Sequence, residues 1–416
     1  MSATTPAAAE PLAPPPTLGR IAREWTRIGV LGFGGPPAHI VMLRDLVVRR
    51  ERWIDAARFE DAVAATGLLP GPASTQLAIF CAGALGGWRG AFIGGAGFIL
   101  PGLVAVVALS AVLLQDGAPM WVVAIGAGAG AAVPAIAIFA GSQLLPDSRK
   151  RAQQAAGAAH ARWFAWVAAG VLGAAFVGPA VVLVLLGSGA IELAWWAWKR
   201  RGADADGRDG PRRGRGSDRL TSFSSPWVLA AAAGAVTTGT LAAVAWTAFK
   251  VGALSYGGGF VIIPMMQADA VDVHGWLSEA QFLTAVAIGQ ITPGPVTNTV
   301  AAVGWAAARI PGAIVGGLFA FGPSVIGIAA AGRHFELVRQ SAGAQAFLLG
   351  SGPAALGAIL GSAIPLAMGL HEPWQWAVLA AAIPALLSRK APLLAVIAAA
   401  AAAGLAAHAL GATIPH

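Results

Sequence analysis

Two kinds of short motif, each present twice, carry the residue types in this sequence that could bind an anion. One is a glycine-rich stretch, at 32–36 and again at 256–259, and the other is a Pro-Gly-Pro triplet, at 70–72 and 293–295. A helix that restarts after such a break presents free backbone N–H groups and about half a positive charge, which attract anions. The candidate ligands of an oxyanion are the glycines of these motifs and the hydroxyl and amide side chains that follow the triplets: Gly34, Gly35, Gly257, Gly258, Gly71, Gly294, Ser74, Thr75, Gln76, Thr297 and Asn298.

A second interpretation of the same motifs needs no ligand. Glycine permits close packing of helices, and a hydroxyl side chain at a helix start can cap the free N–H groups there. The duplication of both motifs at matching positions favours an anion site, and the packing interpretation stays as the alternative.

Two cations precede the glycine-rich stretches at the same spacing. They are Arg27 and Lys250, and Lys250 lies in an apolar run. A cation at the centre of a membrane helix costs about 2.5–3.5 kcal/mol, so it usually has a partner or faces a polar cavity. We expect the two cations to come together from opposite halves of the molecule and to attract the anion. In the alternative interpretation, their long side chains extend to the membrane interface.

His39 is the candidate for a proton relay, because it follows the first glycine-rich stretch closely. A histidine that is simply packed in the interior is the alternative. The single cysteine, Cys81, excludes an internal disulfide and a metal site built from cysteines. Nothing in the sequence resembles a nucleotide-binding loop, a catalytic triad or a metal cluster, so we expect no catalytic residue, no metal and no cofactor.

The composition determines which elements must position these residues. Of the 416 residues, 57% are hydrophobic and 11% are charged, and the mean hydropathy is +0.69. A soluble domain has about 45–50% apolar and about 25% charged residues. The composition therefore predicts an all-α polytopic protein embedded in a lipid bilayer, and it excludes a cytosolic enzyme, a nucleic-acid binder and a disordered scaffold. The net charge of +8 fits cytoplasmic loops, because eight of the 27 Lys and Arg residues fall between 199 and 219.

Apolar runs long enough to cross a bilayer predict the membrane spans. The run at 163–198 is too long for one helix and contains Gly178 and Pro179, so we divide it into two helices. The shorter runs at 226–243 and 374–388 are weaker candidates. The other predicted spans are 90–114, 120–145, 311–332, 344–370 and 391–412.

The sequence contains one pattern twice, which is the mark of an internal repeat. At a spacing of 223 residues the matching pairs include Arg27 and Lys250, Trp53 and Trp276, Phe59 and Phe282, and the two Pro-Gly-Pro triplets. After a deletion of one residue the spacing is 222, and then Gly94 matches Gly316 and Pro101 matches Pro323.

The two copies differ in the charge of one loop. Residues 44–58 hold five arginines, whereas the equivalent residues 267–281 hold no lysine or arginine. The positive-inside rule places the first loop in the cytoplasm and the second on the other side, so we expect the copies to have inverted topology. The same rule places the basic loop at Arg149 inside only if the Pro-Gly-Pro segment turns back as a re-entrant hairpin. A kinked helix that spans the membrane is the alternative.

These patterns predict a domain organisation. Residues 1–18 are a disordered cytoplasmic tail, 19–198 the N-terminal transport repeat (copy one), 199–225 a basic cytoplasmic linker and 226–416 the inverted C-terminal repeat (copy two). We expect about nine full spans, with four half-length or re-entrant segments at the glycine-rich and Pro-Gly-Pro motifs. Assembly as a homodimer stays open.

The motifs together resemble the chromate ion transporter family, in its long-chain form with two fused halves. The residues that carry the resemblance are Arg27 to Pro36, Trp53, Leu69 to Pro72 with Thr75 and Gln76, Lys250 to Gly252, Tyr256 to Gly259, and Gln290 to Pro295. The resemblance implies a multi-pass exporter of the bacterial inner membrane that uses the proton-motive force and confers chromate resistance. Sulfate is the close chemical analogue of its substrate.

One position departs from the family's pattern. Where the family usually has a glutamine before the Pro-Gly-Pro triplet, copy one has Gly67 and copy two keeps Gln290, which adds Gln290 as a lesser candidate ligand. The alternatives to chromate export are a transporter or importer of sulfate or another oxyanion, an enzyme within the membrane, and a passive anion channel.

Overall fold

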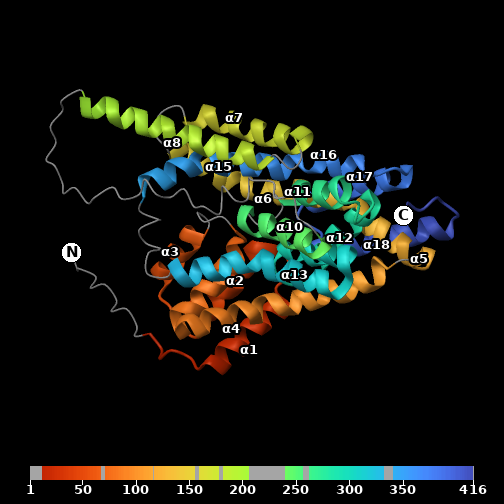
Figure 1. Cartoon of the computed structure of the whole chain (residues 1–416), viewed down its shortest axis with the longest axis horizontal. Coiled ribbons are helices and arrows are strands. Elements are labelled where there is room, and N and C mark those ends of the chain that lie inside the picture. The colour runs from red at the N-terminus through yellow and green to blue at the C-terminus, as the bar shows by residue number, and fades with distance from the viewer. Residues whose placement is uncertain are drawn as a thin grey trace, which may run out of the picture.

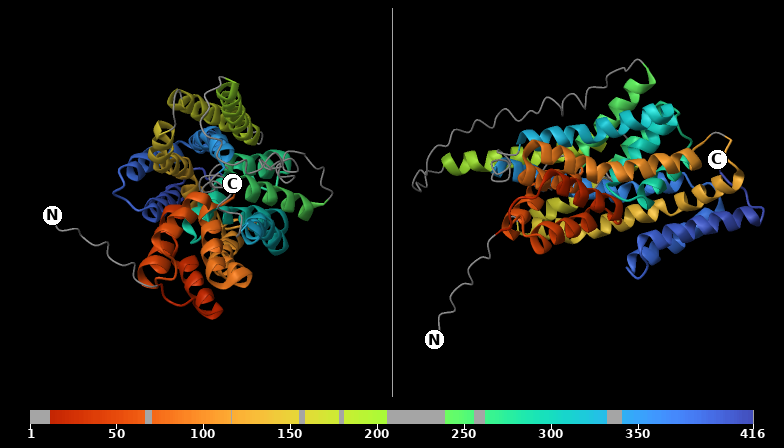
Figure 2. Two further views of the ribbon diagram at one scale, coloured as in Figure 1. Left: turned by 90° about the vertical axis from the view of Figure 1, so that its left-hand side faces the viewer. Right: turned by 90° about the horizontal axis from the view of Figure 1, so that it is seen from below.

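The computed structural model describes residues 12–66, 71–115, 117–154, 159–177, 181–205, 239–255, 262–331 and 341–415. Throughout these residues the regular structure is helical, without a strand, which confirms the predicted all-α class. The helices run broadly along the longest axis of the molecule (Figure 1), and seen along that axis they form a bundle (Figure 2).

The elements of the two copies follow one another in the same order. In each copy a helix ends at a break, a short helix runs into a π-helical turn, one helix precedes the Pro-Gly-Pro triplet (the PGP turn) and a long helix follows it. Copy one contains α1 (Leu18–Leu31), α2 (Gly35–Arg44), η1 (Asp45–Arg50), α3 (Ala56–Thr66), α4 (Ala73–Leu113), α5 (Met120–Ala131), α6 (Val133–Gln154), α7 (Ala159–Leu172), η2 (Gly173–Val177) and α8 (Val181–Ala205). Copy two contains α10 (Thr240–Leu254), α11 (Ile263–Gln267), η5 (Ala268–Val273), α12 (Glu279–Ile291), η6 (Val296–Asn298), α13 (Thr299–Ala331), α15 (Ala342–Gly361), α16 (Ala363–Met368), α17 (Pro373–Leu387) and α18 (Leu393–Ala409).

The long helix α4 consists of two antiparallel arms. Gly86 and Gly87 have non-helical backbone angles, and a Cβ atom on Gly83 would lie 3.2 Å from the Cβ atom of Ala91 on the other arm. The second arm corresponds to the predicted span 90–114. The small residues at the contact allow the two arms to pack backbone to backbone.

The long helix α13 of copy two turns at the equivalent place. Its non-helical residues are Ala308 and Arg309, which are 222 residues beyond the glycine pair of α4. Across this turn, a Cβ atom on Gly316 would lie 3.0 Å from the carbonyl oxygen of Val300. Neither turn was predicted. Gly86 and Gly87 are typical turn residues, whereas Ala308 and Arg309 favour a helix and carry no turn signal.

The chain also reverses at the second PGP turn. A Cβ atom on Gly289, at the end of α12, would lie 3.4 Å from the Cα atom of Thr299, at the start of α13. Two residues ten positions apart in a kinked but continuing helix would be about 15 Å apart. The chain therefore reverses direction at this turn, and a re-entrant position of the hairpin in the membrane stays a prediction.

The two copies interlock instead of folding side by side. Helix α5 of copy one packs on α17 and α18 of copy two, and α15 of copy two packs on α7 and α8 of copy one. Glycines permit these contacts: a Cβ atom on Gly128 in α5 would lie 2.9 Å from the backbone of Gly404 in α18. Helices α4 and α13 pack against each other, with α1 packed on α4 and α10 packed on α13.

The surface and helix lengths are those of a multi-pass membrane protein. Six helical segments of the described chain are long and apolar enough to cross a membrane, and three more apolar helices are shorter. Large apolar side chains such as Phe92, Val104 and Leu318 are exposed, as expected of residues that face lipid. The predicted division of 163–198 corresponds to α7 with η2, followed by α8. The predicted span 226–243 and the linker 199–225 lie mostly outside the described residues, although α8 continues to Ala205.

Candidate functional site

Two equivalent hydrogen bonds join the copies at the centre of the fold. The N–H of Gly71 in the first PGP turn donates to the carbonyl oxygen of Ser255 (2.7 Å), and the N–H of Gly294 in the second donates to that of Gly32 (2.9 Å). The two donor residues are 223 positions apart in the sequence, and so are the two acceptor residues. This is the spacing of the internal repeat, so the two bonds are equivalent. Each PGP turn is therefore held by the end of the first helix of the other copy, α10 or α1.

Both PGP turns need glycine at their centre. Gly71 has φ +125° and Gly294 has φ +91°, in a region that residues with a Cβ atom avoid. The turns are also close to other groups: a Cβ atom on Gly71 would lie 2.8 Å from the Ser324 hydroxyl, and one on Gly294 would lie 3.3 Å from the Asn298 Nδ2 atom. The helices that follow begin after Pro72 and Pro295, and no side chain caps their free N–H groups.

We call the two PGP turns, together with the helix ends that hold them, the crossing. The hydroxyl and amide residues that were predicted as ligands are all buried. Several of their polar atoms have no hydrogen-bond partner within the described residues, namely Thr75 Oγ1, Gln290 Nε2 and both amide atoms of Asn298. Buried polar groups nearly always have a partner, so such a cluster is what a polar ligand would occupy. The buried candidates are Ser74, Thr75, Gln76, Gln290, Thr297 and Asn298.

Two further residues belong to the crossing and were missed from the sequence. Ser255 and Ser324 are buried, and their hydroxyl groups have no partner among the described residues. Ser255 directly follows α10, and Ser324 lies on the second arm of α13 next to Pro323. A lone serine beside a break is an ordinary capping residue in sequence, and only the contact with Gly71 distinguishes these two.

The glycines of the first break lie at the start of α2, and their role as anion ligands stays a prediction. Gly34 and Gly35 have φ +99° and +72°, and they start α2 at a partly exposed position, with open space beside Gly35. The backbone group that reaches the crossing is the carbonyl of Gly32, because Gly34 and Gly35 already lie beyond the end of α1. Gly257 and Gly258 lie outside the described residues.

His39 stands between the first break and the first PGP turn. With the proton on Nε2, its ring donates to the Gly32 carbonyl oxygen (2.9 Å), and Nδ1 accepts the Ser74 hydroxyl (3.2 Å). The edge of the ring also contacts Phe98 at 4.9 Å between centroids. His39 is fully buried. The structure places this candidate directly at the crossing, and its role as a proton relay stays a prediction.

The structure does not bring the two candidate cations together. Arg27 is exposed on α1, which packs on α4 and α2. Lys250 is largely buried on α10, which packs on α13 and α11, and it forms a 2.5 Å ion pair with Asp269 of η5. Thr247 donates a second bond to the same carboxylate oxygen, at 3.0 Å. The two cations are apart because α4 and α13 pack between α1, which carries Arg27, and α10, which carries Lys250.

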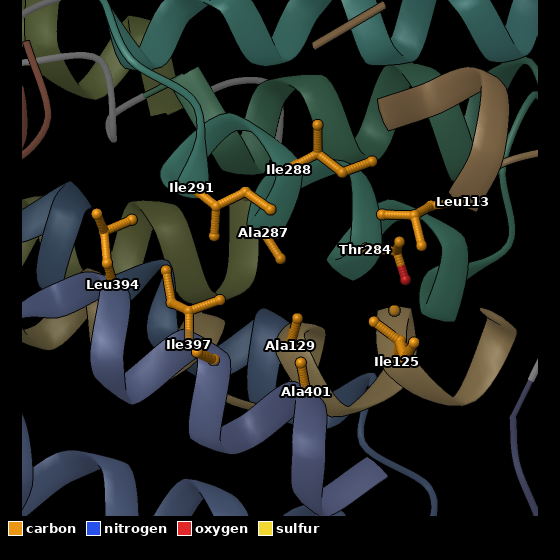
Figure 3. Close-up of a pocket in the computed structure, with 12 residues that line it drawn as sticks. Leu113, Ile125, Ala129, Thr284, Ala287, Ile288, Ile291, Leu394, Ile397 and Ala401 are labelled. Atoms are coloured by element: carbon orange, nitrogen blue, oxygen red, sulfur yellow. The ribbon is translucent and has the colours of Figure 1, made fainter. Parts of the chain in front are cut away.

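A hollow elsewhere in the molecule is unsuited to an anion. A cavity of about 280 Å³ lies between α4, α5, α12 and α18, and its walls are almost entirely aliphatic (Figure 3). Its one hydroxyl, on Thr284, already donates to the Ala280 carbonyl. A dianion would lose its hydration there without compensation. In the described part of the chain, no group of three His, Cys, Asp or Glu residues could hold a metal ion.

The fold and the crossing define a class: a multi-pass helical membrane protein whose broken helices meet at a buried polar centre, as in secondary transporters. Comparison with known families identifies the chain more closely. The model of the family described as "Chromate transporter" matches residues 19–193 and 242–405. The chain belongs to the chromate transporter family, which confirms the resemblance found in its motifs.

Curated relatives agree with this assignment. A "Chromate transport protein" of Cupriavidus metallidurans is 30% identical over 370 residues, which cover 88% of this chain and 86% of the relative. A "Probable chromate transport protein" of Synechococcus elongatus is 31% identical over 360 residues, 86% of each chain. A "Chromate transport protein" of Pseudomonas aeruginosa is 28% identical over 390 residues. No solved structure matches the chain.

Proposed function

We propose that this protein exports chromate from the bacterial cytoplasm across the inner membrane and so confers chromate resistance. The observation that carries the proposal is the crossing of the two PGP turns, where buried hydroxyl and amide groups without partners lie beside helix starts that no side chain caps. A tetrahedral oxyanion presents only hydrogen-bond acceptors when fully deprotonated, so N–H and O–H donors are the groups it needs.

The proposed cradle consists of the two PGP turns and the helix starts that follow them. Its side-chain members are Ser74, Thr75, Gln76, Thr297 and Asn298, with Gln290 as a lesser contributor. Arg27 and Lys250 are the proposed electrostatic anchors. Lys250 is largely buried and paired with Asp269, whereas Arg27 is exposed. His39 is the proposed proton relay.

The electrical energy favours export. Each elementary charge that crosses 100 mV is worth about 2.3 kcal/mol, so moving a dianion out of a negative interior gains about 4.6 kcal/mol. Import would need three or more co-transported protons to make the electrical energy favourable. We propose that the membrane potential, as part of the proton-motive force, drives the export.

The proposed topology follows the charge asymmetry of the loops. The copies are inverted, the N-terminus is cytoplasmic, and the arginine-rich loop at 44–58 faces the cytoplasm. The equivalent order of elements and the matching hydrogen bonds between the copies support a two-fold relation of this kind.

Chromate uptake by everted membrane vesicles tests the proposal. We expect saturable uptake that energisation stimulates, that Lys250→Ala abolishes and that Asn298→Ala weakens. Arg89→Ala, which removes an exposed arginine next to the turn of α4, is the control and retains uptake. The proposal is contradicted if uptake does not depend on energisation, or if neither Lys250→Ala nor Asn298→Ala changes it.

Three further outcomes, two in the vesicle assay and one with the purified protein, distinguish the alternatives. Uptake of sulfate in preference to chromate indicates a transporter of sulfate or another oxyanion. Uptake that does not saturate indicates a channel. Loss of chromate by reduction, in the purified protein without vesicles, indicates an enzyme.

A further inference from the structure

The two PGP turns have matching backbones but different surroundings. Ser255 and Ser324 of copy two lie at the first turn. The residues at the equivalent positions of copy one, Gly32 and Gly102, lie at the second turn and have no side chain. Both serines are nine-tenths or more buried, and both hydroxyls have no partner within the described residues.

Two contacts place these serines at the first turn. The Ser255 carbonyl accepts the N–H of Gly71, and the Ser324 hydroxyl lies 2.8 Å from where a Cβ atom of Gly71 would be, beside the amide of Gln76. Thr75, in the first turn of the helix that follows, adds a third hydroxyl without a partner. The first PGP turn is thus lined with three hydroxyl groups and the Gln76 amide.

The second turn is lined differently. Asn298 takes the place of Thr75, and its Nδ2 atom approaches Gly294. Its Nδ2 and Oδ1 atoms both have no partner among the described residues. Gly102 packs directly against Pro293 and Asn298, which leaves no room for a side chain.

These surroundings differ in what they offer to a dianion. A hydroxyl can rotate its single hydrogen towards an anion and its lone pairs away, whereas an amide brings a carbonyl oxygen along with its N–H₂ group. A fully deprotonated oxyanion has no hydrogen to give to that carbonyl. The first turn offers three such hydroxyls in addition to the Gln76 amide, and it therefore suits a dianion better than the second.

We propose that the first PGP turn is the primary subsite for a tetrahedral dianion, and that the hydroxyls of Ser255 and Ser324 complete it from the opposite copy. This inference rests on the proposed function. The subsite needs both copies, because copy one supplies Gly71 and Thr75 and copy two supplies the two serines.

Transport kinetics in everted vesicles test the subsite. Ser324→Gly gives the first turn the residue that the second turn has, and Ser255→Ala removes only a hydroxyl. Each change raises the KM for chromate about tenfold or more, the loss expected for one hydrogen bond to a charged group, and changes the maximal rate less than about twofold. Ser324→Thr keeps the hydroxyl and keeps the KM within about threefold of wild type.

Ser351→Ala is the matched control. Ser351 in α15 is also buried, with a hydroxyl that has no partner in the described chain, but it lies far from the crossing, beside Gly350 and its contact with α8. We expect the KM of the Ser351→Ala variant for chromate to stay at the wild-type value. Stabilisation of the purified variants by chromate, measured as a shift in Tm, gives a second readout that does not depend on transport.

The outcomes separate this inference from the function on which it rests. Wild-type transport with an unchanged KM and an unchanged chromate-induced Tm shift in both serine variants overturns the subsite alone. A wild type that transports sulfate and not chromate overturns the proposed substrate, and the same variants then test the subsite with sulfate. A wild type that transports neither anion overturns both.

Discussion

The two copies hold their broken helices together with different polar groups. In copy two, Lys250 of α10 pairs with Asp269 of η5, and Thr247 donates to the same carboxylate. In copy one the positions of the lysine and its carboxylate partner are taken by Arg27, which is exposed, and Leu46, which is buried. The buried ion pair that closes the hairpin of copy two thus has no counterpart in copy one.

Copy one uses His39 for the corresponding purpose. Its ring links the Gly32 carbonyl to the Ser74 hydroxyl, and the equivalent residue in copy two is the buried Ile262. The backbone bonds of the PGP turns, by contrast, are the same in both copies. The comparison teaches that the shared backbone bonds define the scaffold, while the side chains that fasten each half have diverged.

The largest difference between the copies concerns the buried ion pair. Asp269→Ala leaves Lys250 buried without its partner and costs about 3–5 kcal/mol of stability. Arg27→Ala removes an exposed cation and changes stability by less than about 0.5 kcal/mol. The measurement is thermal unfolding of the purified protein in detergent. The double variant Lys250→Met with Asp269→Leu recovers most of the loss, and equal losses for Asp269→Ala and Arg27→Ala would contradict the contrast.

The two PGP turns respond unequally to a methyl group. Gly71→Ala and Gly294→Ala each introduce backbone strain of about 1–3 kcal/mol, because both positions have positive φ. Gly71→Ala adds overlap with the Gln76 amide and the Ser324 hydroxyl, whereas the new atom at Gly294 approaches Asn298 only to 3.3 Å. We expect a lower Tm and weaker chromate uptake for Gly71→Ala. An equal or larger effect at Gly294 would show that the surroundings of the two turns do not differ as described.

His39 links the first break of copy one to the first PGP turn, and replacing it measures what this link contributes to stability. His39→Ala leaves the Ser74 hydroxyl buried without its acceptor and weakens the bonding of the Gly32 carbonyl, at a cost of about 1–3 kcal/mol. Ile262→Val, at the equivalent place in copy two, is the control and costs about 0.5–1.5 kcal/mol. Chemical or thermal unfolding measures both. If His39→Ala unfolds at the wild-type temperature, the histidine does not fasten the break.

The smallest expected effect lies at the turns between the arms of α4 and α13. Gly87 has φ +62° and ψ −155°, and its equivalent Arg309 has φ +53° and ψ −140°, a region that costs a residue with a side chain about 1–3 kcal/mol. Arg309→Gly should raise stability by up to about 1 kcal/mol, after loss of the contact between the guanidinium and the Trp305 ring. Gly87→Ala should lower it by a similar amount. A stabilising Gly87→Ala would contradict this reading of the turn.

Much of the fold could be predicted from the sequence, because lipid leaves few solutions for the backbone. Apolar runs of about 20 residues must be helical in a bilayer, and the predicted runs at 344–370, 374–388 and 391–412 correspond to α15 with α16, α17 and α18. The repeat could also be found by matching residues. The turns at Gly86 and Ala308 could not, since they depend on packing between the two arms and the second of them lacks a turn residue.

The candidate site, too, could be predicted from the sequence only in part. The PGP turns and the polar residues after them were recognisable, because glycine, proline and hydroxyl residues at a helix start have local physical meanings. The partners of these residues were not: the expectation that Arg27 and Lys250 meet did not allow for α4 and α13 between them. Ser255, Ser324 and Asp269 carry no local signal, and they matter only through what they contact.

By itself the sequence determined a helical membrane protein, the positions of its two copies and the motifs at which its helices break. Each of these follows from local chemistry: apolar runs, helix-breaking residues and matching spacings. Only the tertiary structure decided that Gly71 binds Ser255 and Gly294 binds Gly32. Those partners are far apart in the chain, and their meeting depends on how the two copies interlock, which no local preference specifies.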